Sequence, residues 1–185
     1  MHASSAHPLL ILKEMDDACR KILGENSKPA KFDKQIWSGI GFRIFKDELV
    51  IQNIYIDEIL DTNIQNSLSS VPGAKPWFLG LTSLRGQPLS IIDLKQYLFN
   101  KPTTLMKSSR LVVVKSNNQI FGLLLEEVFG LSQFPVHLEE EKQIDYFSKE
   151  IKPFIDTTFN DNGVVRGNFS IPALIKNKEF SNAAR

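Results

Sequence analysis

The chain has 185 residues and a formal net charge of +1, from 22 lysines and arginines against 21 aspartates and glutamates. This length fits one domain that buries a core without metals or disulfides. The balanced charge argues against a protein that binds nucleic acid by neutralising phosphates, and the single cysteine, Cys19, excludes an internal disulfide. The apolar run Leu9 to Leu12 is too short for a signal peptide or a membrane span, so we expect a cytoplasmic protein without membrane insertion.

The N-terminal segment is predicted to be an extension of the main domain. From Pro8 to Gly24, apolar residues recur at the three- and four-residue steps of an amphipathic helix: Leu12, Met15, Cys19 and Ile22. This narrow stripe either packs on its own domain or docks a partner. A polar linker follows, over Glu25 to Lys34. We therefore expect an N-terminal extension over 1–35, a main domain over 36–178 and a C-terminal tail over 179–185.

The main domain shows the two-residue period of β-strands. Strands are predicted over 36–45, 49–52, 78–85, 89–92, 111–114, 120–125, 128–134, 154–159 and 164–169. The segment 54–60 is apolar-rich, 61–70 resembles a surface loop, and Gly130 indicates a bulge. Only short helices are expected, over Leu94 to Phe99 after an Asp93 cap and over about Pro172 to Lys176. The fold class is therefore mainly β, either barrel-like or a sandwich.

The stretch from Val71 to Leu94 organises the chain. A strand ends at Arg85, Gly86 allows a tight reversal, and a second apolar strand leads to Asp93. A charged arginine at the end of an apolar strand is unusual. Because a guanidinium binds carboxylates through two parallel hydrogen bonds, Arg85 either holds the turn internally or recognises a partner.

The sequence Gly80-Leu81-Thr82-Ser83-Leu84-Arg85-Gly86 with Ile91-Ile92-Asp93-Leu94 resembles the motif of the CheW-like domain family. The family usually has Asn where this chain has Ser83, and Pro where it has Ser90. The stretch 37–43 and the N-terminal helix are similar to the type IV pilus branch of the family. The resemblance covers about 36–177.

This resemblance implies two small SH3-like β-barrel lobes and an adaptor without catalytic activity. The implied partners are a CheA-type histidine kinase, bound through its CheW-like regulatory domain, and a PilJ-like methyl-accepting chemoreceptor. The implied function is control of pilus-driven twitching motility. By the same resemblance Glu58 pairs with Arg85 beside the receptor-binding surface. The predicted receptor groove consists of Glu58, Arg85, Ile56, Ile59, Ser83 and Gly86.

No residue pattern predicts catalysis, a cofactor or a metal. The histidines are His2, His7 and His137, and none has a second histidine or a cysteine within four residues. Phosphate-binding glycine motifs and a nucleophile elbow are absent from the sequence. Two alternatives remain open: a small-molecule-binding β-barrel or enzyme with a composite pocket, and a peptide-binding module of another pathway. The first predicts a concave cavity with converging polar groups, whereas an adaptor predicts flat or grooved surfaces.

Overall fold

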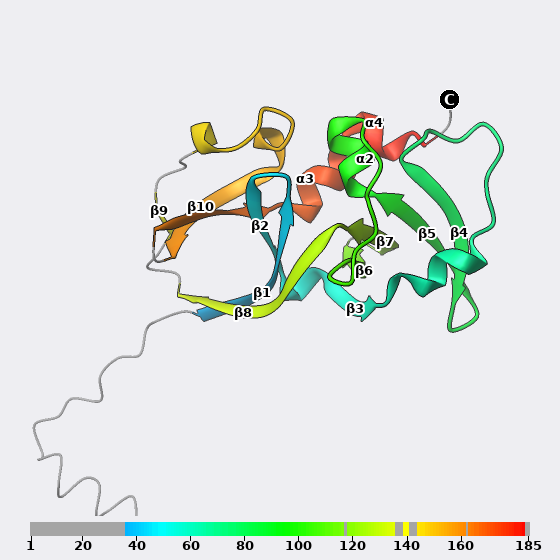
Figure 1. Cartoon of the computed structure of the whole chain (residues 1–185), viewed down its shortest axis with the longest axis horizontal. Coiled ribbons are helices and arrows are strands. Elements are labelled where there is room, and N and C mark those ends of the chain that lie inside the picture. The colour runs from blue at the N-terminus through cyan, green and yellow to red at the C-terminus, as the bar shows by residue number, and fades with distance from the viewer. Residues whose placement is uncertain (1–35, 117, 136–138, 141–143, 162, 184–185) are drawn as a thin grey trace, which may run out of the picture. The chain divides into compact units, whose positions relative to one another are not determined.

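The computed structural model describes residues 36–116, 118–135, 139–140, 144–161 and 163–183 (Figure 1). The helix and the linker predicted within 1–35 lie outside the described residues. The described part is mainly β, as the sequence predicted, and it forms two sheets that we call the first and the second lobe.

The first lobe is a six-stranded sheet with the order β8-β1-β2-β11-β10-β9. Its strands are β1 (Ile36–Ile44), β2 (Asp47–Gln52), β8 (Glu127–Pro135), β9 (Glu139–Glu140), β10 (Ile155–Asp161) and β11 (Val164–Phe169). Neighbouring strands are antiparallel except β2 and β11, which are parallel. The chain thus begins this sheet, leaves it after β2 and returns to it at β8 (Figure 1).

The second lobe is a five-stranded sheet with the order β3-β6-β7-β5-β4. Its strands are β3 (Ile56–Leu60), β4 (Phe78–Leu84), β5 (Gln87–Asp93), β6 (Arg110–Ser116) and β7 (Gln119–Leu125). The apolar-rich segment 54–60 supplies β3, together with the 3-10 turn η1 (Asn53–Tyr55). The segment 61–70, expected to be a loop, contains the 3-10 helix η2 (Thr62–Ser67).

One hydrophobic core joins the two lobes. Its buried side chains come from both sheets, for example Phe42 and Leu49 from the first and Val112 and Leu123 from the second. The opposite face of the second sheet has its own smaller cluster: Leu89, Ile91, Leu111, Val113 and Leu124. Because successive strand residues point to opposite faces, the unbroken apolar run of β6 supplies both clusters. The second sheet is therefore buried on both sides.

The helix predicted after Asp93 is confirmed as α2 (Leu94–Phe99). The Asp93 side chain accepts a hydrogen bond from the Gln96 amide at 3.0 Å, which is the N-cap contact. The same carboxylate accepts bonds at 2.7 Å from the amide and the hydroxyl of Thr103. Asp93 therefore fixes both the start of α2 and the loop that follows it.

The C-terminal end contains more structure than the sequence indicated. Besides α3 (Ile171–Lys176), the chain forms a short helix α4 (Lys178–Ser181), which begins just before the predicted tail 179–185. The Phe180 ring stacks on Trp77 with centroids 5.7 Å apart. The Lys75 amide donates to the Ala183 carbonyl at 2.8 Å. Aromatic packing of Phe180, which has no signal in the local sequence, holds this segment against the second lobe.

Two predicted turns shift by one or two residues. β1 ends at Ile44, so Phe45 and Lys46 form the turn instead of Lys46 and Asp47. Asp47 is buried at the start of β2 and accepts a 2.6 Å hydrogen bond from the Ser148 hydroxyl. Arg85, expected in a strand, follows the end of β4.

Candidate partner-binding site

Arg85 and Gly86 form a two-residue turn between β4 and β5. Leu84 pairs with Gln87 across the turn, and the φ angles of Arg85 and Gly86 are 52° and 81°. Two positive φ angles are typical of a type I′ hairpin turn, in which Asn-Gly is the common pair. An arginine here therefore occupies a conformation that the backbone would more readily give to asparagine. Its side chain is 74% exposed.

The Arg85 guanidinium forms an ion pair with Glu58 of β3. The Arg85 Nη2 atom lies 2.9 Å from Glu58 Oε2, and the Glu58 side chain is 27% exposed. The two strands β3 and β4 are the first and last of the five-stranded sheet. Contact between Glu58 of β3 and Arg85 of the β4–β5 turn shows that the sheet curves far enough for the arginine side chain to reach the opposite outer strand. Curvature thus brings together two residues 27 positions apart in the chain.

The other predicted groove residues differ in their access to solvent. Ile59 lies next to Glu58 on β3 and is 44% exposed, whereas Ile56 packs partly against the shared core. Ser83 and Gly86 are exposed, Ser83 on β4 and Gly86 in the turn. Ile59 is therefore the predicted apolar residue that a partner can reach most easily.

A pocket of about 240 Å³ lies beside Arg85. It is lined by Asp57, Leu84, Arg85, Gln87, Pro88, Leu89 and Ile120. Of these residues, sequence reasoning had predicted only Arg85 as part of a site. Gln87 and Pro88 directly follow the Arg85-Gly86 turn, so their position in the sequence was enough to predict them. Ile120 comes from β7 and lies at the pocket only because of strand pairing.

A second charged cluster crosses the first lobe. Arg43 of β1 lies 2.7 Å from Glu48 of β2 and 3.0 Å from Glu127 of β8, and Arg166 of β11 lies 3.0 Å from Glu48. The series Glu127–Arg43–Glu48–Arg166 therefore alternates in sign across four adjacent strands. The hydrogen bond that Arg43 donates to Glu48, together with the charges of Glu48 and Glu127, raises the pKa of Arg43 despite partial burial.

The pKa of Glu48 reflects two opposing effects. Burial by itself raises the pKa of the Glu48 carboxyl, but hydrogen bonds and charges from Arg43 and Arg166 outweigh it. The net result is a pKa below the ordinary value of 4.5. Glu48 is thus held as a carboxylate between two guanidinium groups. This cluster stabilises the first lobe, and we assign it no binding role.

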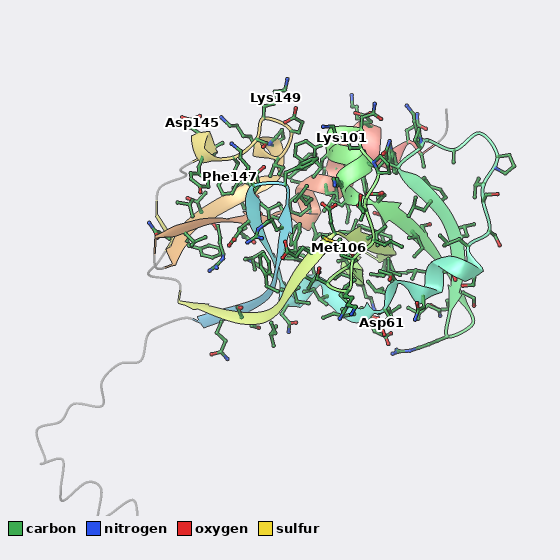
Figure 2. The ribbon with its side chains drawn as sticks, in the orientation of Figure 1. Asp61, Lys101, Met106, Asp145, Phe147 and Lys149 are labelled. Carbon is green, nitrogen blue, oxygen red and sulfur yellow. The ribbon has the colours of Figure 1, made fainter. Side chains whose placement is uncertain are left out.

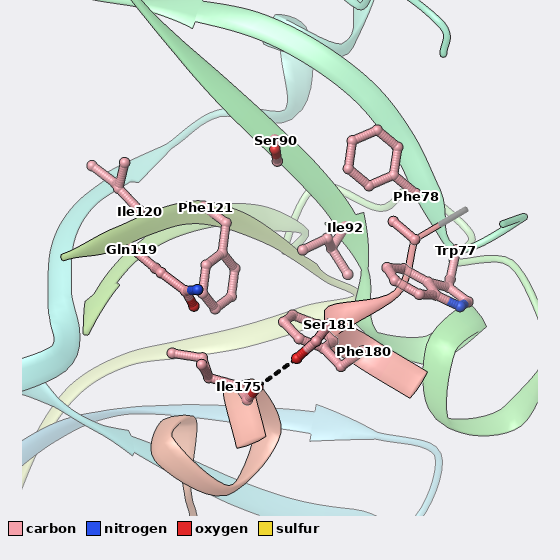
Figure 3. Close-up of a pocket in the computed structure, with 11 residues that line it drawn as sticks. Trp77, Phe78, Ser90, Ile92, Gln119, Ile120, Phe121, Ile175, Phe180 and Ser181 are labelled. Atoms are coloured by element: carbon pink, nitrogen blue, oxygen red, sulfur yellow. Dashed lines mark hydrogen bonds between the residues drawn. The ribbon is translucent and has the colours of Figure 1, made fainter. Parts of the chain in front are cut away.

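A cavity of about 310 Å³ lies between α4 and the second sheet (Figure 3). Its lining is mainly apolar and includes Trp77, Phe121 and Phe180, with Ser90, Gln119 and Ser181 as polar members. The Ser181 hydroxyl donates to the Ile175 carbonyl at 2.8 Å. None of the lining side chains is an acid or a base, so the two serine hydroxyls have no general base among the lining residues to activate them.

The described residues contain no cluster of three or more His, Cys, Asp or Glu side chains placed to hold a metal ion. Among the helices in the described part of the chain, none combines the length and apolar character needed to cross a membrane.

The curved, two-lobed arrangement and the Arg-Gly turn define a class of protein. The family model of the CheW-like domain matches residues 38–179, and the chain belongs to this family. It is a CheW-like adaptor of chemosensory signalling, a class of protein that acts without catalytic activity. CheW-like domains in general bind CheA kinases and chemoreceptors.

Two individual proteins refine this placement. The chain is 32% identical over 154 residues to the protein PilI of Pseudomonas aeruginosa strain PAO1, and the match covers 83% of each chain. A crystal structure of the scaffolding protein TtCheW from Thermoanaerobacter tengcongensis aligns with a TM-score of 0.64 at 17% identity. That alignment covers 77% of this chain and 89% of TtCheW, and it supports the CheW-like fold.

Proposed function

We propose that this protein couples a PilJ-like methyl-accepting chemoreceptor to a CheA-type histidine kinase and thereby controls type IV pilus twitching motility. The similarity to PilI over most of both chains supports the pilus branch of the family. The adaptor acts in the cytoplasm, where membrane-associated chemosensory arrays recruit it. Its CheW-like domain begins at residue 36, with an N-terminal extension before it, and includes α4, which packs on the second lobe through Phe180.

The ion pair of Arg85 and Glu58 carries the proposal for the receptor side. An ion pair this exposed contributes about 0.2–1 kcal/mol to stability, so folding gains little from it. Arg85 also occupies a backbone conformation that favours asparagine or glycine. Arginine at this position makes the turn less favourable, and its ion pair adds little stability. Recognition of a partner therefore explains Arg85 better than a role in folding. Glu58 orients the guanidinium, and Ile59 and the adjoining pocket offer apolar contact to a receptor helix.

The proposed contact with the kinase forms between two domains of the same family. We propose that the CheW-like regulatory domain of the kinase associates with the SH3-like β-barrel lobes of the adaptor through their free strand edges. Among the described residues, β8 of the first lobe pairs with one neighbour only, β1, and it carries no residue of the Arg85 site. Receptor state then biases kinase activity through the positions of the bound proteins, without a chemical step in the adaptor.

The test is co-purification of the adaptor with fragments of the matching receptor and kinase. Arg85→Glu places like charges at the ion pair and is expected to weaken receptor association about tenfold or more, while kinase association and the circular dichroism spectrum are unchanged. Lys149→Glu, which reverses an exposed charge outside the second sheet, is the matched control and should bind both fragments normally. Undiminished receptor binding by Arg85→Glu would contradict the site, and failure of the unaltered protein to bind either fragment would contradict the function.

A further inference from the structure

Phe45 is the most unusual exposed residue of the first lobe. It lies in the β1–β2 turn with a φ of 53°, a left-handed conformation that is costly for a bulky side chain, and it is 44% exposed. Glycine or asparagine would form this turn with less strain. The shared core does not include Phe45. Phenylalanine therefore makes the backbone of this turn less favourable and places an aromatic ring near the surface.

The surroundings of this ring are basic. Phe45 packs edge-on against Phe99 at 4.9 Å between centroids, and the amines of Lys95 and Lys101 lie 4.7 Å and 5.4 Å from its centre. Lys95 is buried and forms an ion pair with Glu126 at 2.5 Å. The two lysines thus differ: one fixes the ring from within the fold, and Lys101 leaves its charge at the surface.

Lys46 adds a second exposed positive charge directly after Phe45. Within the described residues, neither Lys46 nor Lys101 is paired with a carboxylate. We call the surface made by Phe45, Lys46, Phe99 and Lys101 the Phe45 platform. It combines an apolar centre with unpaired amines, which is the complement of an acidic segment that carries an apolar side chain.

We propose that the Phe45 platform is a docking site for an acidic protein segment with an apolar anchor residue. The anchor packs against the exposed part of the Phe45 side chain, and flanking carboxylates bind the amines of Lys46 and Lys101. Two exposed lysines are too few for strong attraction to an anionic membrane, which needs a cluster of basic residues. The proposal does not depend on the receptor or kinase assignment.

The platform is separate from the Arg85 site. In Figure 2, Lys101 lies beside α2 at the top of the view, whereas Asp61, which directly follows β3, lies at the bottom. Met106 lies at the other end of the loop that Lys101 begins (Figure 2). An occupant of the platform therefore does not need to displace an occupant of the Arg85 site, so one adaptor could hold both.

Nuclear magnetic resonance titration of the full-length protein tests the proposal. The probe is a blocked hexapeptide in which leucines alternate with glutamates, compared with a lysine–leucine and a glutamate–glycine peptide. The glutamate–leucine peptide is expected to shift the amide signals of residues 45–46 and 99–101 saturably. The lysine–leucine peptide should leave these signals unchanged. The glutamate–glycine peptide has no apolar anchor, so its affinity should be lower by about threefold or more.

Variants separate a docking role from a structural one. Phe45→Gly removes the ring but relieves the backbone strain, so its melting temperature should stay near that of the unaltered protein while peptide affinity falls about threefold or more. Lys101→Glu should lower affinity likewise. Met106→Ala and Lys107→Glu are matched controls outside the platform, one an exposed apolar residue and one an exposed lysine, and should bind normally.

Three outcomes would overturn the proposal. The first is an absence of saturable shifts at residues 45–46 and 99–101. The second is equal peptide affinity in the unaltered protein, Phe45→Gly and Lys101→Glu. The third is binding to phosphatidylserine vesicles that depends on Phe45 and Lys101 when peptide binding does not, since this would assign the platform to a lipid surface.

Discussion

Gly80 occupies a backbone position that other residues cannot share. Its φ is +139°, and a Cβ atom there would lie 2.5 Å from the Ser69 carbonyl oxygen. Ser69 and Leu81 exchange backbone hydrogen bonds of 2.7 and 2.9 Å at this point, which pins the loop before β4 to that strand. A side chain at Gly80 would therefore push apart two backbone segments, and backbone yields less readily than a flexible side chain.

We predict that Gly80→Ala lowers the free energy of unfolding by about 2 kcal/mol or more. Gly73→Ala is the matched control, because Gly73 also has a positive φ, +75°, but nothing lies within 4 Å of its added Cβ. Its cost should be limited to the conformational part, about 1 kcal/mol. Urea denaturation measures both, and equal losses would contradict the steric explanation.

Glu48 predicts a specific acid sensitivity. Because its pKa in the folded protein lies below the ordinary value of 4.5, the ionised carboxylate stabilises the fold at all pH values above about 4.5. This stabilisation is lost as the pH falls through the folded pKa. Glu48→Gln should lower the free energy of unfolding by about 1–3 kcal/mol at pH 7, and the difference from the unaltered protein should shrink below about pH 4.

Urea denaturation at a series of pH values measures this difference. Asp145→Asn is the control, because Lys152 lowers the pKa of Asp145 through an ion pair in which the Asp145 side chain is fully exposed to solvent. Solvent screening removes most of the consequence for stability. A pH-independent effect of Glu48→Gln would show that the carboxylate charge is not what stabilises this part of the first lobe.

In the β4–β5 turn, the residue that suits the backbone best differs from the residue that the proposed function needs. Asparagine adopts the left-handed conformation of Arg85 more readily than arginine does. Arg85→Asn is therefore expected to leave the free energy of unfolding unchanged or to raise it by up to about 1 kcal/mol, since only an exposed ion pair is lost.

The same variant should lose receptor association in the co-purification assay. Chemical denaturation and fragment binding measured on one preparation distinguish the two effects. A variant that is clearly destabilised would indicate that Arg85 is retained to hold the turn, and the recognition role would then lose its main support.

The two lobes are expected to unfold as one unit, although they consist of two sheets. The larger core contains buried residues of both lobes, so neither sheet keeps its apolar face covered when the other unfolds. Leu123→Ala, at a fully buried position of that core, should cost about 2–5 kcal/mol and destabilise both lobes together. Ile54→Ala, at an exposed apolar position, should change stability by less than about 0.5 kcal/mol.

Amide hydrogen exchange measures the two lobes separately in one experiment. We expect the slowest-exchanging amides of β1 and β6 to accelerate by the same factor in Leu123→Ala. Acceleration confined to β6 would contradict a shared core, and the lobes would then have to be treated as independent units.

The sequence by itself determined the features that act over a few residues. The Asp93 cap of α2 and the reversal at Arg85-Gly86 follow from contacts and dihedral preferences within one turn of chain. The bulge predicted at Gly130 is also present, as a register shift between β1 and β8. The CheW-like motif lies in the same local stretch, which is why the family was recognisable before the fold.

Only the tertiary structure decided which distant residues meet. Arg43 finds Glu127 across 84 positions and Arg166 finds Glu48 across 118, because strand pairing sets these distances and no local preference encodes them. The sheet curvature that brings Arg85 to Glu58, and the packing of Phe180 that orders the C-terminal end, depend in the same way on non-local burial. Local chain geometry is fixed by neighbouring atoms, whereas a binding surface depends on the arrangement of whole sheets.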